Sequence, residues 1–156
     1  MVSLLIDGKK VEVESSQTIL QAAQKIGIHI PTLCHDPRLA PSGACRMCVV
    51  EVTGMRTLAA SCATPVSEGM NVSTQSEQVT RARKLNLELI WSNHPNDCLT
   101  CDKTGECQLQ KLMYEYDVKT SRFVEQNPPS IPDNSNPGIF RDMNKCILCG
   151  KCVRIC

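Results

Sequence analysis

The sequence is poor in large aromatic side chains, with one Trp, two Tyr and two Phe among its 156 residues. A chain of this length makes one ordinary domain or two to three small ones. With so few rings to fill a core, we expect small modules held together by something besides apolar burial. No apolar stretch approaches the roughly 20 residues of a membrane helix, so we expect no direct membrane insertion.

An excess of charge of either sign is also lacking. Lys and Arg total 17, Asp and Glu total 16, and no basic run or stripe occurs, so nucleic acid is a poor candidate partner. The start MVSLLIDGKK has a very short apolar run before its charges and does not resemble a signal peptide, so we expect a cytoplasmic protein. There is no Gly-rich phosphate loop and no grouping of Ser, His and Asp, and we therefore expect no catalytic residue in this chain.

Cysteine, by contrast, is abundant, and all eleven Cys residues fall into three sets, the second of which includes a His. The sets are, in chain order, Cys34, Cys45, Cys48 and Cys62; His94, Cys98, Cys101 and Cys107; and Cys146, Cys149, Cys152 and Cys156. An odd count, many pairs three residues apart and no signal peptide argue against disulfides. Metal ligation is the better interpretation, and zinc is a candidate because Cys–x2–Cys pairs also form zinc sites.

The first set has the spacing Cys–x10–Cys–x2–Cys with a fourth Cys further on, so that three thiolates come from one loop. The plant-type 2Fe–2S pattern follows the same logic with a shorter first gap. Residues 41–44 of the loop are small or rigid, which lets backbone N–H groups approach the sulfurs. We interpret this set as the ligands of a 2Fe–2S cluster, with a stretched zinc site as the alternative.

The second set, called here the histidine-containing set, combines one His with three Cys residues. His94 lies four residues before Cys98 and directly precedes Pro95, where a helix is expected to end. Three Cys with one His are an ordinary ligand set for zinc, and they can also hold an iron–sulfur cluster. The residues alone leave both interpretations open.

The third set, Cys–x2–Cys–x2–Cys–x3–Cys, is the run of bacterial ferredoxins. In that run the first three Cys hold one 4Fe–4S cluster and the fourth ligates a neighbouring one. A Pro normally follows, and a second run comes later. Neither is present after Cys156, and we expect that the protein was cut inside this module.

The periodicity predicts an α+β chain. Alternating apolar residues at 2–6 and 11–13 flank Asp7-Gly8, which is a strong hairpin signal. A short helix with Thr18 as N-cap and Gln21 as its capping-box partner ends at Gly27, and strands follow near 48–52 and 70–74. Hairpin, helix, cysteine loop and returning strands together describe a β-grasp.

Two further helices and a linker are predicted after the β-grasp. Thr74 and Glu77 form a candidate capping box for the first helix, and the second helix covers about 105–116. The apolar stripes of these two helices are Val79, Ala82, Leu85 and Leu89 in the first, and Leu109, Leu112, Met113 and Tyr116 in the second. The Pro-rich stretch 126–138 is typical of an extended linker.

The three motifs in this order resemble one known architecture. The β-grasp set, the segment HPNDCLTCDKTGECQLQ and the terminal CILCGKCVRIC are similar to the N-terminal iron–sulfur region of the catalytic subunit of NAD-dependent formate dehydrogenases. The same arrangement is found in iron-only hydrogenases and in the large peripheral subunit of complex I. The wording HPNDCLTC favours formate dehydrogenase.

The resemblance implies ligands and cofactors residue by residue. The first set would hold a 2Fe–2S cluster, and the second, His94 included, would hold a 4Fe–4S cluster rather than zinc. Cys146, Cys149 and Cys152 would belong to the next 4Fe–4S cluster, and Cys156 to its neighbour. The expected partners are a diaphorase-type subunit with NAD(P) and flavin, and other iron–sulfur subunits of the same complex.

We therefore predict an electron-transfer segment of a larger oxidoreductase. Its expected parts are a β-grasp 2Fe–2S ferredoxin domain (1–76), a small helical 4Fe–4S domain with one His and three Cys ligands (77–125), the linker (126–138) and the truncated start of a bacterial-ferredoxin-like 4Fe–4S domain (139–156). The alternatives are a segment of an iron-only hydrogenase or complex I, a free-standing ferredoxin-like carrier or small complex subunit, and a zinc-stabilised scaffold.

Overall fold

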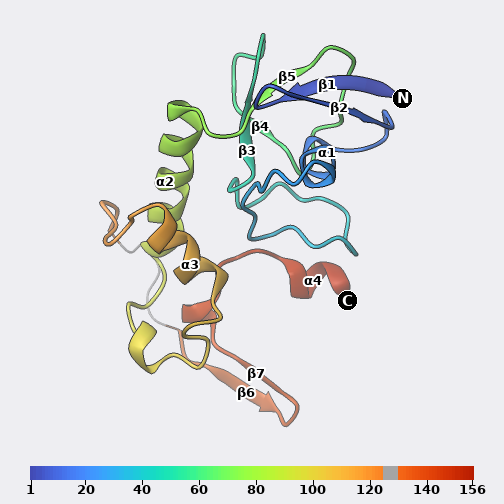
Figure 1. The fold of residues 1–156 in the computed structure, drawn as a ribbon. Helices are drawn as coiled ribbons and strands as arrows, with labels where there is room; N and C mark the ends of the chain where they lie inside the picture. The colour runs from blue at the N-terminus through green and yellow to red at the C-terminus, as the bar shows by residue number, and fades with distance from the viewer. Residues whose placement is uncertain (125–129) are drawn as a thin grey trace. The chain divides into compact units, whose positions relative to one another are not determined.

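The structure, a computed structural model, describes residues 1–124 and 130–156. It divides into two compact units: unit 1 comprises Met1–Arg83 with Gly150–Cys156, and unit 2 comprises Lys84–Cys149. Figure 1 shows the elements in chain order. Within the described ranges, no helix is long and apolar enough to cross a membrane.

Unit 1 is built on a five-stranded mixed sheet with the strand order β2-β1-β5-β3-β4. The strands are β1 (Val2–Ile6), β2 (Lys9–Val13), β3 (Val49–Val52), β4 (Ala59–Ala60) and β5 (Asn71–Ser73). The β1–β5 pair is parallel and the other pairs are antiparallel. The α+β class is confirmed, and the strands predicted near 2–6, 11–13, 48–52 and 70–74 all belong to this one sheet.

The turn between β1 and β2 is formed by the predicted Asp7-Gly8 pair. Both residues have positive φ, 49° at Asp7 and 78° at Gly8. This is the backbone of a type I′ turn, whose twist matches that of the two strands. The Asp7 carboxylate also accepts hydrogen bonds from the backbone N–H (2.7 Å) and the hydroxyl of Thr74. Thr74 therefore fastens the hairpin to the chain that follows β5.

Helix α1 (Ile19–Lys25) forms as the sequence predicted. Thr18 is its N-cap, and the capping box with Gln21 is complete in both directions. The helix ends before Gly27, whose φ of 73° suits glycine. Its buried residues belong to the same apolar cluster as the inward-facing residues of the sheet. That cluster is the core of unit 1.

Helix α2 (Glu77–Trp91) is capped differently from the prediction. The hydroxyl of Ser76 accepts a hydrogen bond from the Val79 N–H (3.3 Å), so Ser76 acts as the cap. The predicted capping box of Thr74 and Glu77 is wrong because the Thr74 hydroxyl is used by Asp7.

The buried face of α2 also differs from the predicted stripe. Leu85 and Leu89 are exposed, whereas Val79, Arg83 and Leu87 are buried. These three residues are spaced i, i+4, i+8 and lie along one side of a helix. The predicted stripe did not include Arg83, because a charged residue is rarely fully buried.

Unit 2 carries the remaining elements apart from the last helix, α4 (Lys151–Ile155), which belongs to unit 1. They are the 3-10 helix η1 (Cys98–Thr100), helix α3 (Gln108–Glu115), the hairpin β6 (Asp133–Asn136) and β7 (Ile139–Arg141), and the 3-10 helix η2 (Met143–Lys145). Helix α3 begins three residues later than predicted because Gly105 has a φ of 81° and Cys107 is the N-cap. Leu109, Leu112 and Met113 are buried, as the periodicity predicted.

The predicted linker is only partly described. Residues 126–129 of it lie outside the described ranges. Its later part contains β6, so this part has secondary structure. Asn136 accepts a hydrogen bond from the Gly138 N–H (2.8 Å), which closes the turn between β6 and β7 around Pro137.

Candidate metal centres

The first cysteine set is gathered in unit 1. Cys34 and Cys45 lie on the long loop between α1 and β3, Cys48 directly precedes β3, and Cys62 follows β4. Cys34, Cys48 and Cys62 are each 1% exposed. Thiols that are hidden to this degree are poorly placed to meet a partner from solution. They are well placed to hold a group inside the protein.

The four sulfurs of this set form two pairs. The Cys34 N–H donates to the Cys45 sulfur (3.4 Å), and the Cys45 N–H donates to the Cys34 sulfur (3.5 Å). The Sγ atoms of Cys48 and Cys62 lie 3.3 Å apart. Two thiolate pairs are the ligand arrangement that the two irons of a 2Fe–2S cluster need, because each iron takes two cysteines.

In each pair the pKa of one thiol is lowered and the pKa of the other is raised. The contact with Cys62 lowers the pKa of Cys48 to about 6, and the same contact raises the pKa of Cys62. Burial raises the pKa of Cys45. Burial also acts on Cys34, but hydrogen bonds from Cys45, Ser42 and Ala44 outweigh it and lower the pKa of Cys34. Because the thiolate is the form that ligates a metal, the lowered pKa values of Cys34 and Cys48 favour metal binding.

The loop between the second and third Cys makes a sharp turn. Arg46 lies in the left-handed region with a φ of 53°, although it is not glycine. This conformation costs a non-glycine residue roughly 1–2 kcal/mol. Gly43, just before the turn, also has a positive φ, of 61°. Backbone strain of this kind is typical of loops that bind a ligand, and here it lies in the loop that carries the sulfurs.

The histidine-containing set lines a cavity of about 370 Å³ in unit 2. Cys98 lies in η1, Cys101 follows η1, and Cys107 is the N-cap of α3, where its sulfur accepts a hydrogen bond from the Gln110 N–H (3.5 Å). All three cysteines and His94 contribute to the cavity wall. The four predicted ligands of this set are therefore brought to one cavity.

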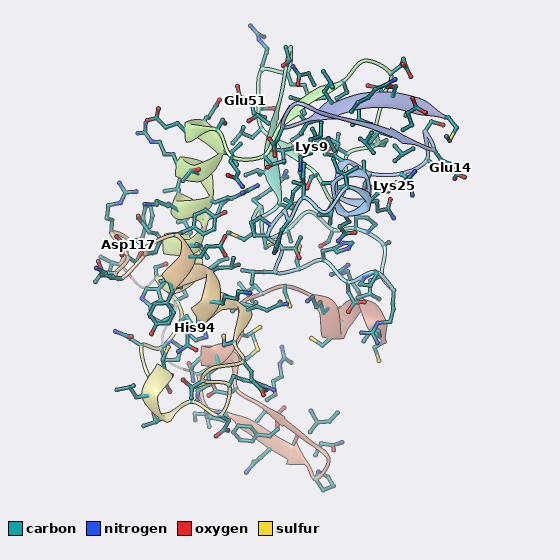
Figure 2. The ribbon with its side chains drawn as sticks, viewed as in Figure 1. Lys9, Glu14, Lys25, Glu51, His94 and Asp117 are labelled. Atoms are coloured by element: carbon teal, nitrogen blue, oxygen red, sulfur yellow. The ribbon has the colours of Figure 1, made fainter. Side chains whose placement is uncertain are left out.

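The His94 ring is held in a defined orientation. Its Nδ1 lies 3.1 Å from the Pro95 carbonyl oxygen, and its ring stacks on Trp91 with centroids 5.5 Å apart. A carbonyl can only accept, so Nδ1 carries a proton, and in the neutral ring Nε2 then has the lone pair that a metal requires. Figure 2 labels His94 among the side chains and shows sulfur atoms in yellow.

An ion pair stands at the rim of the same cavity. The Lys145 ammonium lies 3.4 Å from the Asp97 carboxylate, and both side chains contribute to the lining. The hydrogen bond to Asp97 raises the pKa of Lys145, and the Cys101 thiol adds to this effect. Lys145 directly precedes Cys146, so the residue next to the third set contributes a positive charge to the cavity of the second set.

The third set is divided between the units. Cys146 and Cys149 belong to unit 2, whereas Cys152, on α4, and Cys156, directly after it, belong to unit 1. The Leu148 N–H donates to the Cys146 sulfur (3.4 Å), and Leu148 has a φ of 53°. A left-handed residue thus bends both the loop of the first set and that of the third. No disulfide joins any of the eleven cysteines, all of which lie in the described ranges.

Among residues 1–124 and 130–156, no three His, Cys, Asp or Glu side chains converge tightly enough to hold a single metal ion.

Sequence reasoning missed buried Arg83, which donates to the carbonyl of Val49 (2.8 Å), the residue directly after Cys48. Its only sequence signal was the i, i+4 spacing from Val79.

Two protein families match this chain. Residues 1–77 match the family described as a 2Fe-2S iron-sulfur cluster binding domain. Residues 83–122 match the NADH-ubiquinone oxidoreductase-G iron-sulfur binding region. The first match contains the whole first cysteine set, and the second contains the whole histidine-containing set.

Individual relatives extend the similarity over the full length of the chain. It is 41% identical over 160 residues to an NADH-quinone oxidoreductase subunit of Rhizobium meliloti (strain 1021), covering 100% of this chain and 18% of the relative. It is 44% identical over 161 residues to the NADP-reducing hydrogenase subunit HndD of Solidesulfovibrio fructosivorans, covering 100% of this chain and 28% of the relative. The chain thus spans less than a third of the length of these two relatives.

A solved structure is also similar. The crystal structure of an NAD+-reducing [NiFe]-hydrogenase in the H2-reduced state matches with a TM-score of 0.90 and 38% sequence identity. The match covers 98% of this chain and 64% of that chain.

Proposed function

Since this chain belongs to the family of N-terminal iron–sulfur regions represented in an NADH-quinone oxidoreductase and in an NADP-reducing hydrogenase, we propose that it relays electrons within a nicotinamide-linked oxidoreductase. The families matched bind a 2Fe–2S cluster and a 4Fe–4S cluster. The clusters supply one-electron chemistry when bound. The residues of this chain hold them, limit water access and set their potentials.

The pairing of the first four sulfurs is the observation that carries this proposal. Cys34 with Cys45, and Cys48 with Cys62, would supply two thiolates to each iron of the 2Fe–2S cluster. A structural zinc ion instead takes four ligands around a single centre. The two separate pairs favour the two-iron cluster over the zinc-stabilised scaffold.

The histidine-containing set is proposed as the site of the 4Fe–4S cluster. Support comes from the cavity that the four side chains line and from the Nδ1–H of His94, which is bound by the Pro95 carbonyl. That bond fixes the tautomer and directs Nε2 to the metal. The stacked Trp91 prevents the ring from turning away.

For the third set, the assignment is supported by the spacing of its four cysteines. We propose that Cys146, Cys149 and Cys152 ligate a further 4Fe–4S cluster and that Cys156 ligates its neighbour. The corresponding division of the chain into 1–76, 77–125, a linker at 126–138 and 139–156 is proposed with it.

The proposed class of parent enzyme is broader than the formate dehydrogenase that the sequence alone favoured. The named relatives are a quinone-linked and an NADP-linked enzyme subunit, and they fit a complex I or hydrogenase parent at least as well as formate dehydrogenase. The preference for formate dehydrogenase stays a prediction based on HPNDCLTC. The proposed partners are a diaphorase-type subunit with NAD(P) and flavin, and further iron–sulfur subunits.

The test is metal and sulfide analysis of the full-length protein purified without oxygen. The first two sets should contribute about six iron and six sulfide per chain, and reduction should give paramagnetic signals of both cluster types. Stoichiometric zinc without acid-labile sulfide would exclude the relay and support the scaffold. A protein whose cysteine sets are loaded but which is isolated without other subunits would favour the free-standing carrier.

A further inference from the structure

Arg154, on helix α4, makes hydrogen bonds to the loop of the first cysteine set. Its Nη1 donates to the Ala40 carbonyl (2.7 Å) and its Nη2 to the Cys34 carbonyl (2.7 Å). Its Nε donates to the Gly150 carbonyl at the start of its own helix (3.3 Å). These residues all belong to unit 1. The two long-range bonds span 114 and 120 positions of the sequence.

We propose that Arg154 is a positioning residue that fixes the loop between Cys34 and Cys45 and raises the reduction potential of the 2Fe–2S cluster. The effect on the potential rests on the proposed function, whereas the effect on the loop does not. The two carbonyls lie at the beginning and near the middle of the segment that joins Cys34 to Cys45. Holding both with one rigid fork sets the distance between them and thereby the course of the loop.

The guanidinium group is suited to this task. It is planar, always charged, and presents parallel donors, so two bonds from one group fix direction as well as distance. Both N–O distances are at the short end for N–H···O bonds, as expected for a charged donor. A Lys could reach one carbonyl, but it could not bridge the two in a fixed geometry.

The charge also lies where it affects electron uptake. The Cys34 carbonyl belongs to the residue that supplies the first thiolate, so the guanidinium stands within a few bonds of a ligand sulfur. Reduction adds a negative charge to the cluster, and a nearby cation stabilises that charge. The helix that carries Cys152 therefore contributes to the potential of the first cluster as well as to its own site.

Another arginine of the same loop provides a matched control. Arg38 is exposed and pairs with Asp36 through two contacts of 2.9 Å. It has the same charge as Arg154, but those contacts are to a carboxylate rather than to the loop carbonyls. Removing either arginine changes the net charge of unit 1 by the same amount.

The first experiment is a potentiometric titration of the full-length protein, following the paramagnetic signal of the reduced 2Fe–2S cluster. Arg154→Gln should lower the equilibrium constant for reduction about tenfold, which is about 59 mV for a one-electron couple. Arg154→Lys, which keeps the charge, should retain most of the potential. In Arg38→Gln the reduction potential should stay near that of the wild type. Equal shifts in the two Gln variants, or no shift in Arg154→Gln, would overturn the electrostatic role.

The second experiment needs no cluster. Hydrogen exchange of the metal-free full-length protein should show faster exchange at the Leu39 and Cys45 amides, which are hydrogen bonded within the loop, in both Arg154→Gln and Arg154→Lys. Arg38→Gln should leave the Cys45 amide unchanged. Wild-type exchange rates in both Arg154 variants would overturn the positioning role. Absence of a 2Fe–2S signal in the wild type would instead refute the proposed function. The exchange result would still decide whether Arg154 positions the loop.

Discussion

The imidazole of His94 illustrates how much one residue's surroundings determine its chemistry. Spacing alone made His94 a candidate ligand in a set that zinc could equally use. The Pro95 carbonyl and the Trp91 ring add the orientation, because they leave Nε2 as the acceptor nitrogen and hold the ring in place. A neutral nitrogen ligand brings less negative charge to a cluster than a thiolate does, and this raises the potential.

Replacing His94 tests this assignment. In His94→Cys the 4Fe–4S cluster should be retained with a more negative potential, since a thiolate replaces a neutral ring. The measurement is a redox titration of the full-length protein followed by electron paramagnetic resonance. His29→Cys is the control, because His29 is exposed and lies in unit 1. An unchanged potential in His94→Cys would mean that His94 is not a ligand.

At the scale of elements, α2 shows where pattern reading succeeds and where it fails. Its existence and approximate length were predictable from apolar periodicity. Its buried face was not, because Arg83 is charged and the pattern assigns charges to solvent. Arg83 is nevertheless 3% exposed and donates to the Val49 carbonyl on β3. A backbone carbonyl leaves no trace in the sequence, so a bond of this type cannot be predicted from residue types.

The bond between α2 and β3 should be measurable as stability. Arg83→Met keeps much of the side-chain volume but leaves the buried Val49 carbonyl without this donor, which should cost about 1–3 kcal/mol. Native-state hydrogen exchange of β1 and β3 amides gives the free energy of unfolding of unit 1. The exposed substitution Arg81→Met, on the same helix and in the same unit, should change it by less than about 0.5 kcal/mol. Equal values for the two variants would show that the buried bond contributes nothing.

At the scale of the whole molecule, the two units differ in how much apolar core they possess. Unit 1 has a continuous core formed by its sheet and α1. The buried apolar residues described in unit 2 are Leu87, Leu109, Leu112, Met113 and Val118. A unit with so small a core depends more on its bound group, because metal binding supplies folding free energy where burial cannot.

Removing the metal should therefore affect the units unequally. In the chelator-treated full-length protein, the amides of α3 should lose most of their protection from hydrogen exchange. The amides of β1, β3 and α1 should keep much of theirs. Mass spectrometry of exchange in loaded and metal-free protein measures both at once. Equal loss of protection in the two units would contradict the greater dependence of unit 2 on its bound group.

The candidate sites were predictable to different depths. Spacing predicts which cysteines group together, and the four members of the histidine-containing set line one cavity in unit 2. The pairing of Cys34 with Cys45 and of Cys48 with Cys62 did not follow, because it depends on how the loop returns to β3 and β4. The role of Arg154 was not predictable, since its partners are carbonyls that lie 114 and 120 positions away.

Cys107 is both the cap of α3 and a candidate ligand, and this places any cluster bound there at the amino end of a helix. The aligned peptide dipoles give that end a partial positive charge of about half a unit. An electron added to such a cluster would therefore be stabilised by the backbone of α3 itself, with no charged side chain required. Shortening or unwinding the first turn of α3 would then lower the potential of the cluster in the histidine-containing set, even if every ligand stayed in place.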